Sequence, residues 1–324
     1  MLAQDQFVER RRRDWEELLG LLPEGRSLGK LAPRDIARAM TLYRMACADL
    51  MRAQAAGYDA SLIAHLDALA ARGHNALYCA PGYRLGAIWE LLSVGFPRAF
   101  RRHLPWFWVA AALFVLPGLV GFWGAYASRA FALGLLPEAA VEQMEEAYAE
   151  GFNQGRDEGA DAMMAGFYVR NNVGIAFRCF ALGILFGLGS VFFLVYNGLV
   201  IGAVAGVVSA AGHGGNLLSF ISGHGAFELT AIVIAGTAGL VMGYALVDTG
   251  GRTRFASLRA RAPDLGALVL GAMFMLLLAA GIEAFWSPSA VPAAIKRGVA
   301  VLFYLLVGLY LARVGRPKTS ARVA

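Results

Sequence analysis

The sequence is poor in charged residues and in cysteine. Only 16% of its 324 residues are charged, whereas 58% are hydrophobic, and a soluble domain carries roughly 25% charged residues. The three cysteines, Cys47, Cys79 and Cys179, form no CxxC pair, which argues against a disulfide scaffold or a cysteine metal site. This composition excludes a disordered or collagen-like chain and predicts an all-α polytopic membrane protein.

The signals of common catalytic sites are also missing. The sequence has no P-loop, no HExxH and no GxSxG, which mark nucleotide-binding proteins, zinc proteases and α/β-hydrolases. We therefore expect no catalytic residue and no cofactor. The net charge of +6 comes from arginines beside apolar segments, which favours a role in membrane topology over nucleic-acid binding. The first hundred residues lack the h-region of a signal peptide, so the first span should act as an uncleaved insertion signal.

Three domains are predicted along the chain. Residues 1–103 have a soluble composition, and their amphipathic spacing predicts a cytoplasmic helical bundle. This domain should end in a helix that lies on the membrane surface over residues 82–102. Residues 104–312 should form the transmembrane domain, with an acidic external loop at 128–172, and residues 313–324 a basic cytoplasmic tail.

Six apolar segments are predicted to cross the membrane: 104–127, 173–196, 198–211, 220–247, 265–286 and 299–311. A span needs about 20 residues, so the short third segment could instead be a re-entrant loop. Six full crossings put every arginine-rich region in the cytoplasm and the acidic loop outside, as the positive-inside rule requires. We therefore expect six spans with both termini in the cytoplasm.

Glycines recur at intervals of four in the middle segments, a spacing typical of a glycine zipper. Such glycines line one helix face and let two backbones approach closely. The residues expected to pack in this way are Gly198, Gly202, Gly206, Gly239 and Gly243. The contacts could lie within one chain or between copies, and a homodimer or larger homo-oligomer is expected in the bilayer.

Polar side chains inside the apolar segments need a reason, because an ionised group at mid-bilayer costs about 2.5–3.5 kcal/mol. Six of them should lie in the outer half of the membrane, where they could converge: Asn171, Asn172, Arg178, His224, Glu228 and Glu283. His224 and Glu228 are four residues apart and share a helix face. Asn197 lies at the end of a segment.

Three interpretations of this polar cluster compete. In the first, Arg178 neutralises Glu228 or Glu283 in a buried ion-pair network. In the second, the cluster lines a cavity for an ion, a proton or a lipid headgroup. In the third, His224 and the two glutamates bind a metal, which is the weakest signal because there is only one histidine and no HExxH.

Several motifs, in this order, resemble the stage II sporulation protein M superfamily, and in particular its proteobacterial branch. The motifs are MAGFYVRNN (164–172), YNGL (196–199), GHGAFELT (223–230) and IEAFWS (282–287). The N-terminal features that fit this branch are Phe7 with Trp15 and the short motifs at 42–44, 49–50, 73–74 and 96–98. The resemblance spans nearly the whole chain.

The resemblance implies an all-helical inner-membrane protein without an established catalytic residue. Founding members help to localise peptidoglycan-degrading partners during spore engulfment. Members of the branch resembled here are often encoded near MoxR-type AAA ATPases, von Willebrand factor A proteins and RDD-family membrane proteins, which are therefore the expected partners.

We accordingly expect a non-enzymatic, homo-oligomeric scaffold that docks partners in cell-envelope processes. The alternative is a transporter or channel-like protein that moves a small ion or a lipid headgroup past the polar cluster. A metal-dependent intramembrane hydrolase is the third hypothesis.

Overall fold

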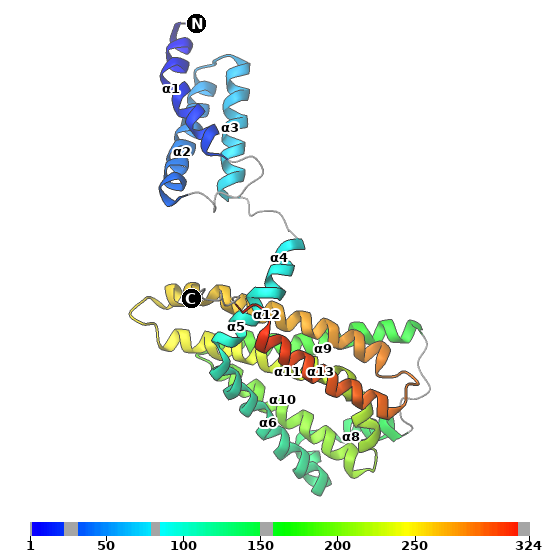
Figure 1. Cartoon of the computed structure of the whole chain (residues 1–324). Helices are drawn as coiled ribbons and strands as arrows, with labels where there is room; N and C mark the ends of the chain where they lie inside the picture. The colour runs from blue at the N-terminus through cyan, green and yellow to red at the C-terminus, as the bar shows by residue number, and fades with distance from the viewer. Residues whose placement is uncertain (1, 23–31, 79–84, 150–157, 317–324) are drawn as a thin grey trace, which may run out of the picture. The chain divides into compact units, whose positions relative to one another are not determined.

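The computed structural model describes residues 2–22, 32–78, 85–149 and 158–316. Within these residues every regular element is a helix (Figure 1), which confirms the all-α class predicted from composition. The chain divides into two compact units, unit 1 over residues 1–87 and unit 2 over residues 88–324. The boundary lies within the short helix α4 (Leu85–Glu90), and each unit has its own hydrophobic core.

Unit 1 is a bundle of three helices, α1 (Leu2–Leu21), α2 (Pro33–Ala55) and α3 (Ala60–Tyr78). Pro33 stands in the first turn of α2, where its missing N–H removes no hydrogen bond. Apolar side chains from all three helices meet in one core: Trp15, Leu18, Leu22, Leu42, Ala46, Ala53, Leu66 and Leu69. The soluble bundle predicted for the N-terminal part is thus a three-helix bundle.

One carboxylate lies inside the core of unit 1. Asp49 is 1% exposed, and its Oδ2 accepts hydrogen bonds from Arg11 Nε at 2.8 Å and Trp15 Nε1 at 3.0 Å. Arg52 on the same helix lies 3.9 Å from the other carboxylate oxygen. A buried charge is tolerated when it is paired and hydrogen-bonded, so Asp49 joins α2 to α1 as a structural residue.

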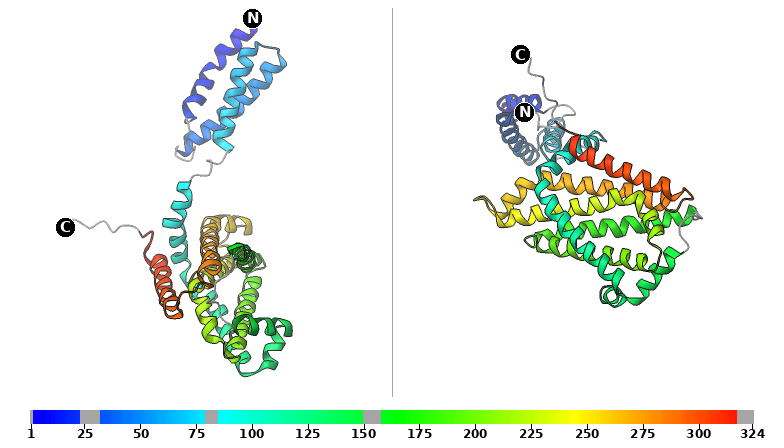
Figure 2. Two further views of the ribbon diagram at one scale, coloured as in Figure 1. Left: turned by 90° about the vertical axis from the view of Figure 1, so that its right-hand side faces the viewer. Right: turned by 60° about the horizontal axis from the view of Figure 1, so that its bottom comes forward.

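Unit 2 is a bundle of long helices that lie side by side (Figure 1, Figure 2). Its elements are the π-helix η2 (Leu91–Gly95), α5 (Phe96–Arg102), α6 (Leu104–Ala127), α7 (Arg129–Leu135), α8 (Glu138–Ala149), α9 (Glu158–Ala181), the 3-10 turn η3 (Leu182–Ile184), α10 (Leu188–Ala210), α11 (Gly214–Val247), α12 (Arg254–Gly281), the π-helix η4 (Ile282–Trp286) and α13 (Ala293–Arg313).

Five helices of unit 2 are long and apolar enough to cross a membrane, so the chain is a multi-pass membrane protein. They are α6, α10, α11, α12 continued by η4, and α13. The helix α9 is also 24 residues long and contacts α10, α11 and α12, but it contains charged residues such as Arg170 and Arg178. At about 1.5 Å per residue, 24 residues extend over about 36 Å, which is enough to cross a bilayer.

The second and third predicted segments were placed wrongly. Residues 173–196 do not form one helix, because the chain turns at 182–187, between α9 and α10. At this turn Phe186 has a φ of 54° and Gly187 a φ of 86°, a left-handed conformation that no α-helix continues through. The second of the five apolar helices is consequently α10, with 23 residues. The short segment that suggested a re-entrant loop does not exist as a separate element.

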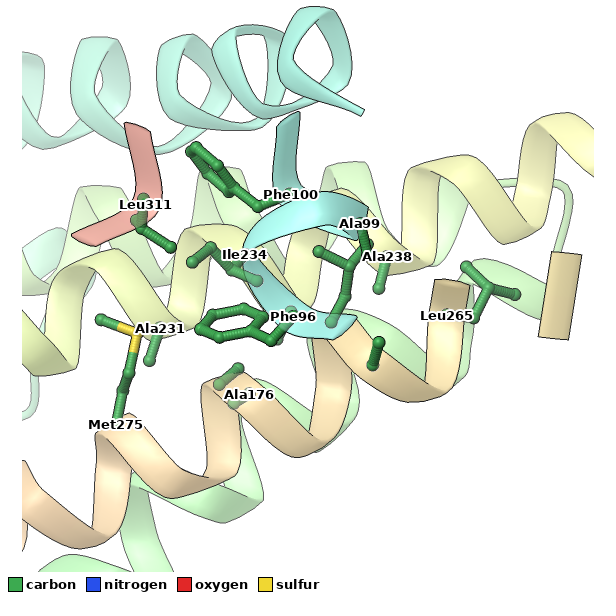
Figure 3. Close-up of a cluster of buried hydrophobic side chains, with 14 of the residues drawn as sticks. Phe96, Ala99, Phe100, Ala176, Ala231, Ile234, Ala238, Leu265, Met275 and Leu311 are labelled. Atoms are coloured by element: carbon green, nitrogen blue, oxygen red, sulfur yellow. The ribbon is translucent and has the colours of Figure 1, made fainter. Parts of the chain in front are cut away.

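The structure describes the predicted surface helix from residue 85 onward, and its second half, α5, packs into unit 2. The residues Phe96, Pro97, Ala99 and Phe100 of α5 are buried, and Figure 3 shows the Phe96 ring among side chains that include Ile234 and Met275. Phe96, which is 1% exposed, belongs to the main core of unit 2. The predicted domain boundary at residue 103 therefore differs from the division at residue 87, because α5 packs against α12 and α13.

The glycines singled out in the sequence lie at close backbone approaches within the chain. Gly198, Gly202 and Gly206 of α10 face the backbone of α6, and a Cβ atom at Gly202 would lie 2.0 Å from the Gly118 oxygen. On α11, a Cβ at Gly239 would lie 2.4 Å from the Cys179 oxygen, and one at Gly243 would meet the Gly187 backbone. These faces are therefore occupied by the chain itself.

The two ends of the bundle differ in charge. At one end the ring centroids of Trp106 on α6 and Tyr244 on α11 are 5.0 Å apart, and the Arg254 guanidinium lies over the Phe186 ring. Arginines gather at this end: Arg98, Arg101, Arg102, Arg252, Arg254, Arg259, Arg261, Arg313 and Arg316. At the other end Asn216 donates to the Tyr148 carbonyl of the acidic helix α8. We call these the basic end and the acidic end.

Candidate functional site

Two ionisable side chains lie on one face of α11, in the half of the helix nearer the acidic end. His224 and Glu228 are four residues apart, and His224 Nε2 lies 3.8 Å from Glu228 Oε2. The His224 side chain is 6% exposed and that of Glu228 15%. The i and i+4 positions predicted to share a face therefore hold these two groups close together.

The third member of the site comes from another element. Glu283 lies in the π-helix η4, at the end of α12, and is 7% exposed. His224, Glu228 and Glu283 each offer one possible ligand atom, and these three atoms lie within 4.8 Å of one another. We call these three residues the His-Glu-Glu cluster. π-helices are rare, and they appear mostly as single turns that are frequently found at functional sites.

A glycine lets η4 approach α11. A Cβ atom at Gly223 would lie 2.7 Å from Cδ1 of Trp286 and 2.9 Å from Cγ2 of Ile282. Both residues belong to η4, as does Glu283. Only glycine fits beside His224 at this separation, so the residue preceding the histidine allows Glu283 to reach the cluster.

The loop after η4 supports the histidine. Ser287 Oγ lies 3.0 Å from His224 Nδ1, and the Ser287 carbonyl accepts a hydrogen bond from Lys296 Nζ at 2.7 Å. Lys296, which is 2% exposed, also donates to the Ser289 carbonyl at 2.7 Å. Sequence reasoning missed Ser287 and Lys296. The signal for Ser287 is its place at the end of the IEAFWS motif (282–287), four residues after Glu283.

Arg178 is not part of this cluster, which corrects the predicted ion pair. Its side chain is exposed, and no ion pair joins it to Glu228 or Glu283. The last turn of α9, which carries Arg178, lies beside Gly239 of α11, because a Cβ atom at Gly239 would touch the Cys179 oxygen. Gly239 is 15 residues beyond His224 on α11, a separation of about 22 Å along a helix. The prediction placed Arg178 near the start of a helix over 173–196. In the structure Arg178 instead lies in the last turn of α9, which ends at residue 181.

The hydrogen bonds of the asparagines in the described part of the chain do not reach the cluster. Asn172 is buried and accepts a hydrogen bond from Asn171 Nδ2 at 3.0 Å. Asn197 Nδ2 donates to the Phe193 carbonyl of its own helix. Among the described residues, neither Asn171 nor Asn172 hydrogen-bonds to the His-Glu-Glu cluster. The alternative transport pathway therefore keeps the histidine and two glutamates and loses its arginine.

Unit 1 carries a groove between α1 and α3. A groove of about 910 Å³ lies between these helices, lined by Gln4, Asp5, Val8, Glu9, Arg10, Arg12, Arg13, Ser61, Leu62 and His65. It therefore combines basic and acidic side chains with apolar ones. Nearby, Arg38 donates hydrogen bonds to Glu17, which lower the pKa of Glu17.

The comparisons with known proteins decide the family. Residues 110–288, more than half of the chain, match the family model for stage II sporulation protein M. The chain belongs to this family. The resemblance recognised in the sequence motifs is thereby confirmed. Residues 5–79 match the model of a domain of unknown function (DUF8413). No curated protein and no solved structure matches the chain.

The part that matches the stage II sporulation protein M model contains the whole His-Glu-Glu cluster and Ser287, whereas Lys296 lies beyond it. The separate match to residues 5–79 coincides with unit 1. The two units of the structure thus correspond to two family models. The chemistry available in the membrane unit is one imidazole and two carboxylates, a set that can bind a cation or hold a proton.

Proposed function

We propose that this member of the stage II sporulation protein M family crosses the bacterial inner membrane six times, with both termini in the cytoplasm. The five apolar helices together with α9 give six crossings, and the arginines of the basic end support its cytoplasmic placement. The acidic helix α8 then lies outside. The boundaries differ from the sequence prediction, but the number and direction of the crossings stay the same.

Cysteine labelling tests this topology. In a variant whose Cys47, Cys79 and Cys179 are replaced by alanine, single cysteines are introduced at Glu145 and at Arg252. An impermeant maleimide added to intact spheroplasts should label position 145 and label position 252 only after lysis. Labelling of both positions from the same side would contradict six crossings.

We further propose that the protein is a non-enzymatic scaffold that docks partners in cell-envelope processes. The observation that carries this proposal is the separate three-helix unit 1, which has a core of its own and a charged groove between α1 and α3. A separate helical module linked to a membrane unit is suited to partner binding. The partners that the resemblance suggests are MoxR-type ATPases, von Willebrand factor A proteins and RDD-family membrane proteins.

Photo-crosslinking in cells tests the docking proposal. A photoreactive residue placed at Leu62, in the groove, should give a crosslink to one of the proteins encoded nearby, whereas the same residue at the exposed Met51 of α2 should not. If both positions give the same set of crosslinks, or none, the groove is not the docking surface.

We propose that the scaffold is a homo-oligomer, and that α9 provides the contact between copies. The glycine face of α10 is already occupied by α6, whereas Phe177 on α9 is 61% exposed beside the exposed Arg178. In the cysteine-free protein, Phe177→Cys should form a disulfide-linked dimer in membranes, and Leu302→Cys on the exposed face of α13 should not. A monomeric mass in detergent, together with no Phe177→Cys dimer, would contradict this.

A further inference from the structure

The His-Glu-Glu cluster has the spacing of a metal site. A tetrahedral metal with bonds of about 2.0–2.1 Å separates its ligand atoms by about 3.4 Å. His224 Nε2 and Glu228 Oε2 are 3.8 Å apart, and the ligand atoms of all three residues lie within 4.8 Å. Shifts of several tenths of an ångström to about 1 Å, which side-chain rotations supply, would bring these atoms to the bonding positions.

The histidine is oriented as a metal ligand is. A ligating imidazole usually donates its second ring N–H to a neighbouring oxygen, which fixes the tautomer that points a lone pair at the metal. Ser287 Oγ lies 3.0 Å from His224 Nδ1. This oxygen can accept a hydrogen bond from the Nδ1 N–H, which leaves the lone pair of Nε2 directed at Glu228. Lys296 holds the loop that carries Ser287 through two hydrogen bonds to its carbonyls.

A cation would offset the repulsion between the two carboxylates of the cluster. Two carboxylates at this separation repel each other unless a proton or a cation lies between them. Arg178, the cation expected from the sequence, is exposed and lies elsewhere on α9. In the described part of the chain, no arginine or lysine lies within ion-pair distance of Glu228.

We propose that His224, Glu228 and Glu283 bind one divalent transition-metal ion of the zinc type. One imidazole with two carboxylates suits such a metal, whereas calcium and magnesium favour shells made of oxygen alone. Three protein ligands leave the fourth tetrahedral position for water or another ligand. The ion joins α11 to η4, and Ser287 acts as a positioning residue for the histidine.

Metal binding by the full-length protein tests the site. The chain is purified in detergent with a tag that contains no histidine, stripped with EDTA, and titrated with zinc chloride. The wild-type protein should bind one zinc per chain. Glu228→Gln and Glu283→Gln should lose this binding, and Ser287→Ala should weaken it by about 10–100-fold, the usual effect of removing a residue that orients a ligand. Cobalt chloride, added in place of zinc, should give the visible bands of four-coordinate Co²⁺.

The matched control is Glu145→Gln, which makes the same chemical change on α8, where Glu145 accepts a hydrogen bond from Arg129. It should bind zinc as the wild type does. If a glutamine variant fails to fold, Ser287→Ala and the cobalt spectrum of the wild type still decide the question. Equal zinc binding by all variants would place the metal elsewhere. The absence of zinc binding by the wild type would mean that the carboxylates share a proton. Either result would overturn the proposal.

Discussion

The two units bury polar groups in opposite ways. In unit 1 the buried Asp49 is neutralised by Arg11 and hydrogen-bonded by Trp15, inside a core of large side chains. In unit 2 two glutamates and a histidine are gathered together, and the neighbouring helices approach through glycines such as Gly202 and Gly223. The first arrangement pairs a carboxylate with a cation of the same chain, and the second brings together three groups that could bind a metal ion.

This difference separates a structural acid from a functional one. A buried carboxylate with a cation and a donor around it holds helices together, and its removal leaves those partners unpaired. Carboxylates placed near each other repel, so their removal relieves strain unless a cation is bound.

The largest effect is expected from Gly202→Leu. A Cβ atom there would lie 2.0 Å from the Gly118 oxygen of α6, and a helix backbone cannot yield locally. Overpacking costs about 1–3 kcal/mol and occasionally more, and we expect at least the upper value. The folded yield in detergent should fall sharply. Gly308→Leu, at a position on α13 where a Cβ meets nothing within 4 Å, should leave the yield unchanged. A normal yield of Gly202→Leu would show that α6 and α10 are not packed as described.

Asp49→Asn should destabilise unit 1 and leave unit 2 folded. Breaking a buried ion pair costs about 3–5 kcal/mol, but the Arg11 side chain is 19% exposed and can reach water, so we expect about 2–3 kcal/mol. Hydrogen exchange of peptides from α1 and α2 should accelerate, while that of α11 stays constant. Asp67→Asn on the exposed side of α3 is the control. Equal exchange in both variants would show that Asp49 is not the structural acid described.

The corresponding change in unit 2 should have the opposite sign. In EDTA, Glu228→Gln removes one of two neighbouring carboxylates and should leave the melting temperature unchanged or raise it. With zinc in excess, the wild type should gain stability through ligand binding and the variant should not. A clear loss of stability of Glu228→Gln in EDTA would make this glutamate a structural acid like Asp49 and erase the contrast.

The smallest effect concerns acid sensitivity. The hydrogen bonds from Arg38 lower the pKa of Glu17 below its ordinary value of 4.5, and those from Ser61 lower the pKa of Asp59. A carboxyl group whose pKa is lower in the folded state contributes stability above its unfolded pKa, and this is lost as the pH falls through the folded value. The protection factors of amides in α1 and α2, which are corrected for the intrinsic pH dependence of exchange, should therefore decrease below pH 4.5, and less so in Glu17→Gln. An identical pH profile for this variant would show that the Arg38 contact adds nothing.

The sequence predicted the fold class and the proximity of His224 to Glu228, because composition and helical periodicity carry that information. It misplaced the turn at 182–187, since the apolar run there continues unbroken and a left-handed Phe186 leaves no compositional trace. That single error brought Arg178 into the predicted cluster. The π-helix that presents Glu283 and the support from Ser287 depend on tertiary packing, which one sequence does not display.

Anomalous diffraction at the zinc edge, from crystals of EDTA-stripped protein grown with zinc, tests most directly whether the His-Glu-Glu cluster binds a metal. We expect one peak in the membrane unit, about 2.0–2.2 Å from His224 Nε2 and from a carboxylate oxygen of each of Glu228 and Glu283. Ordered side chains at these three residues with no peak between them would contradict it.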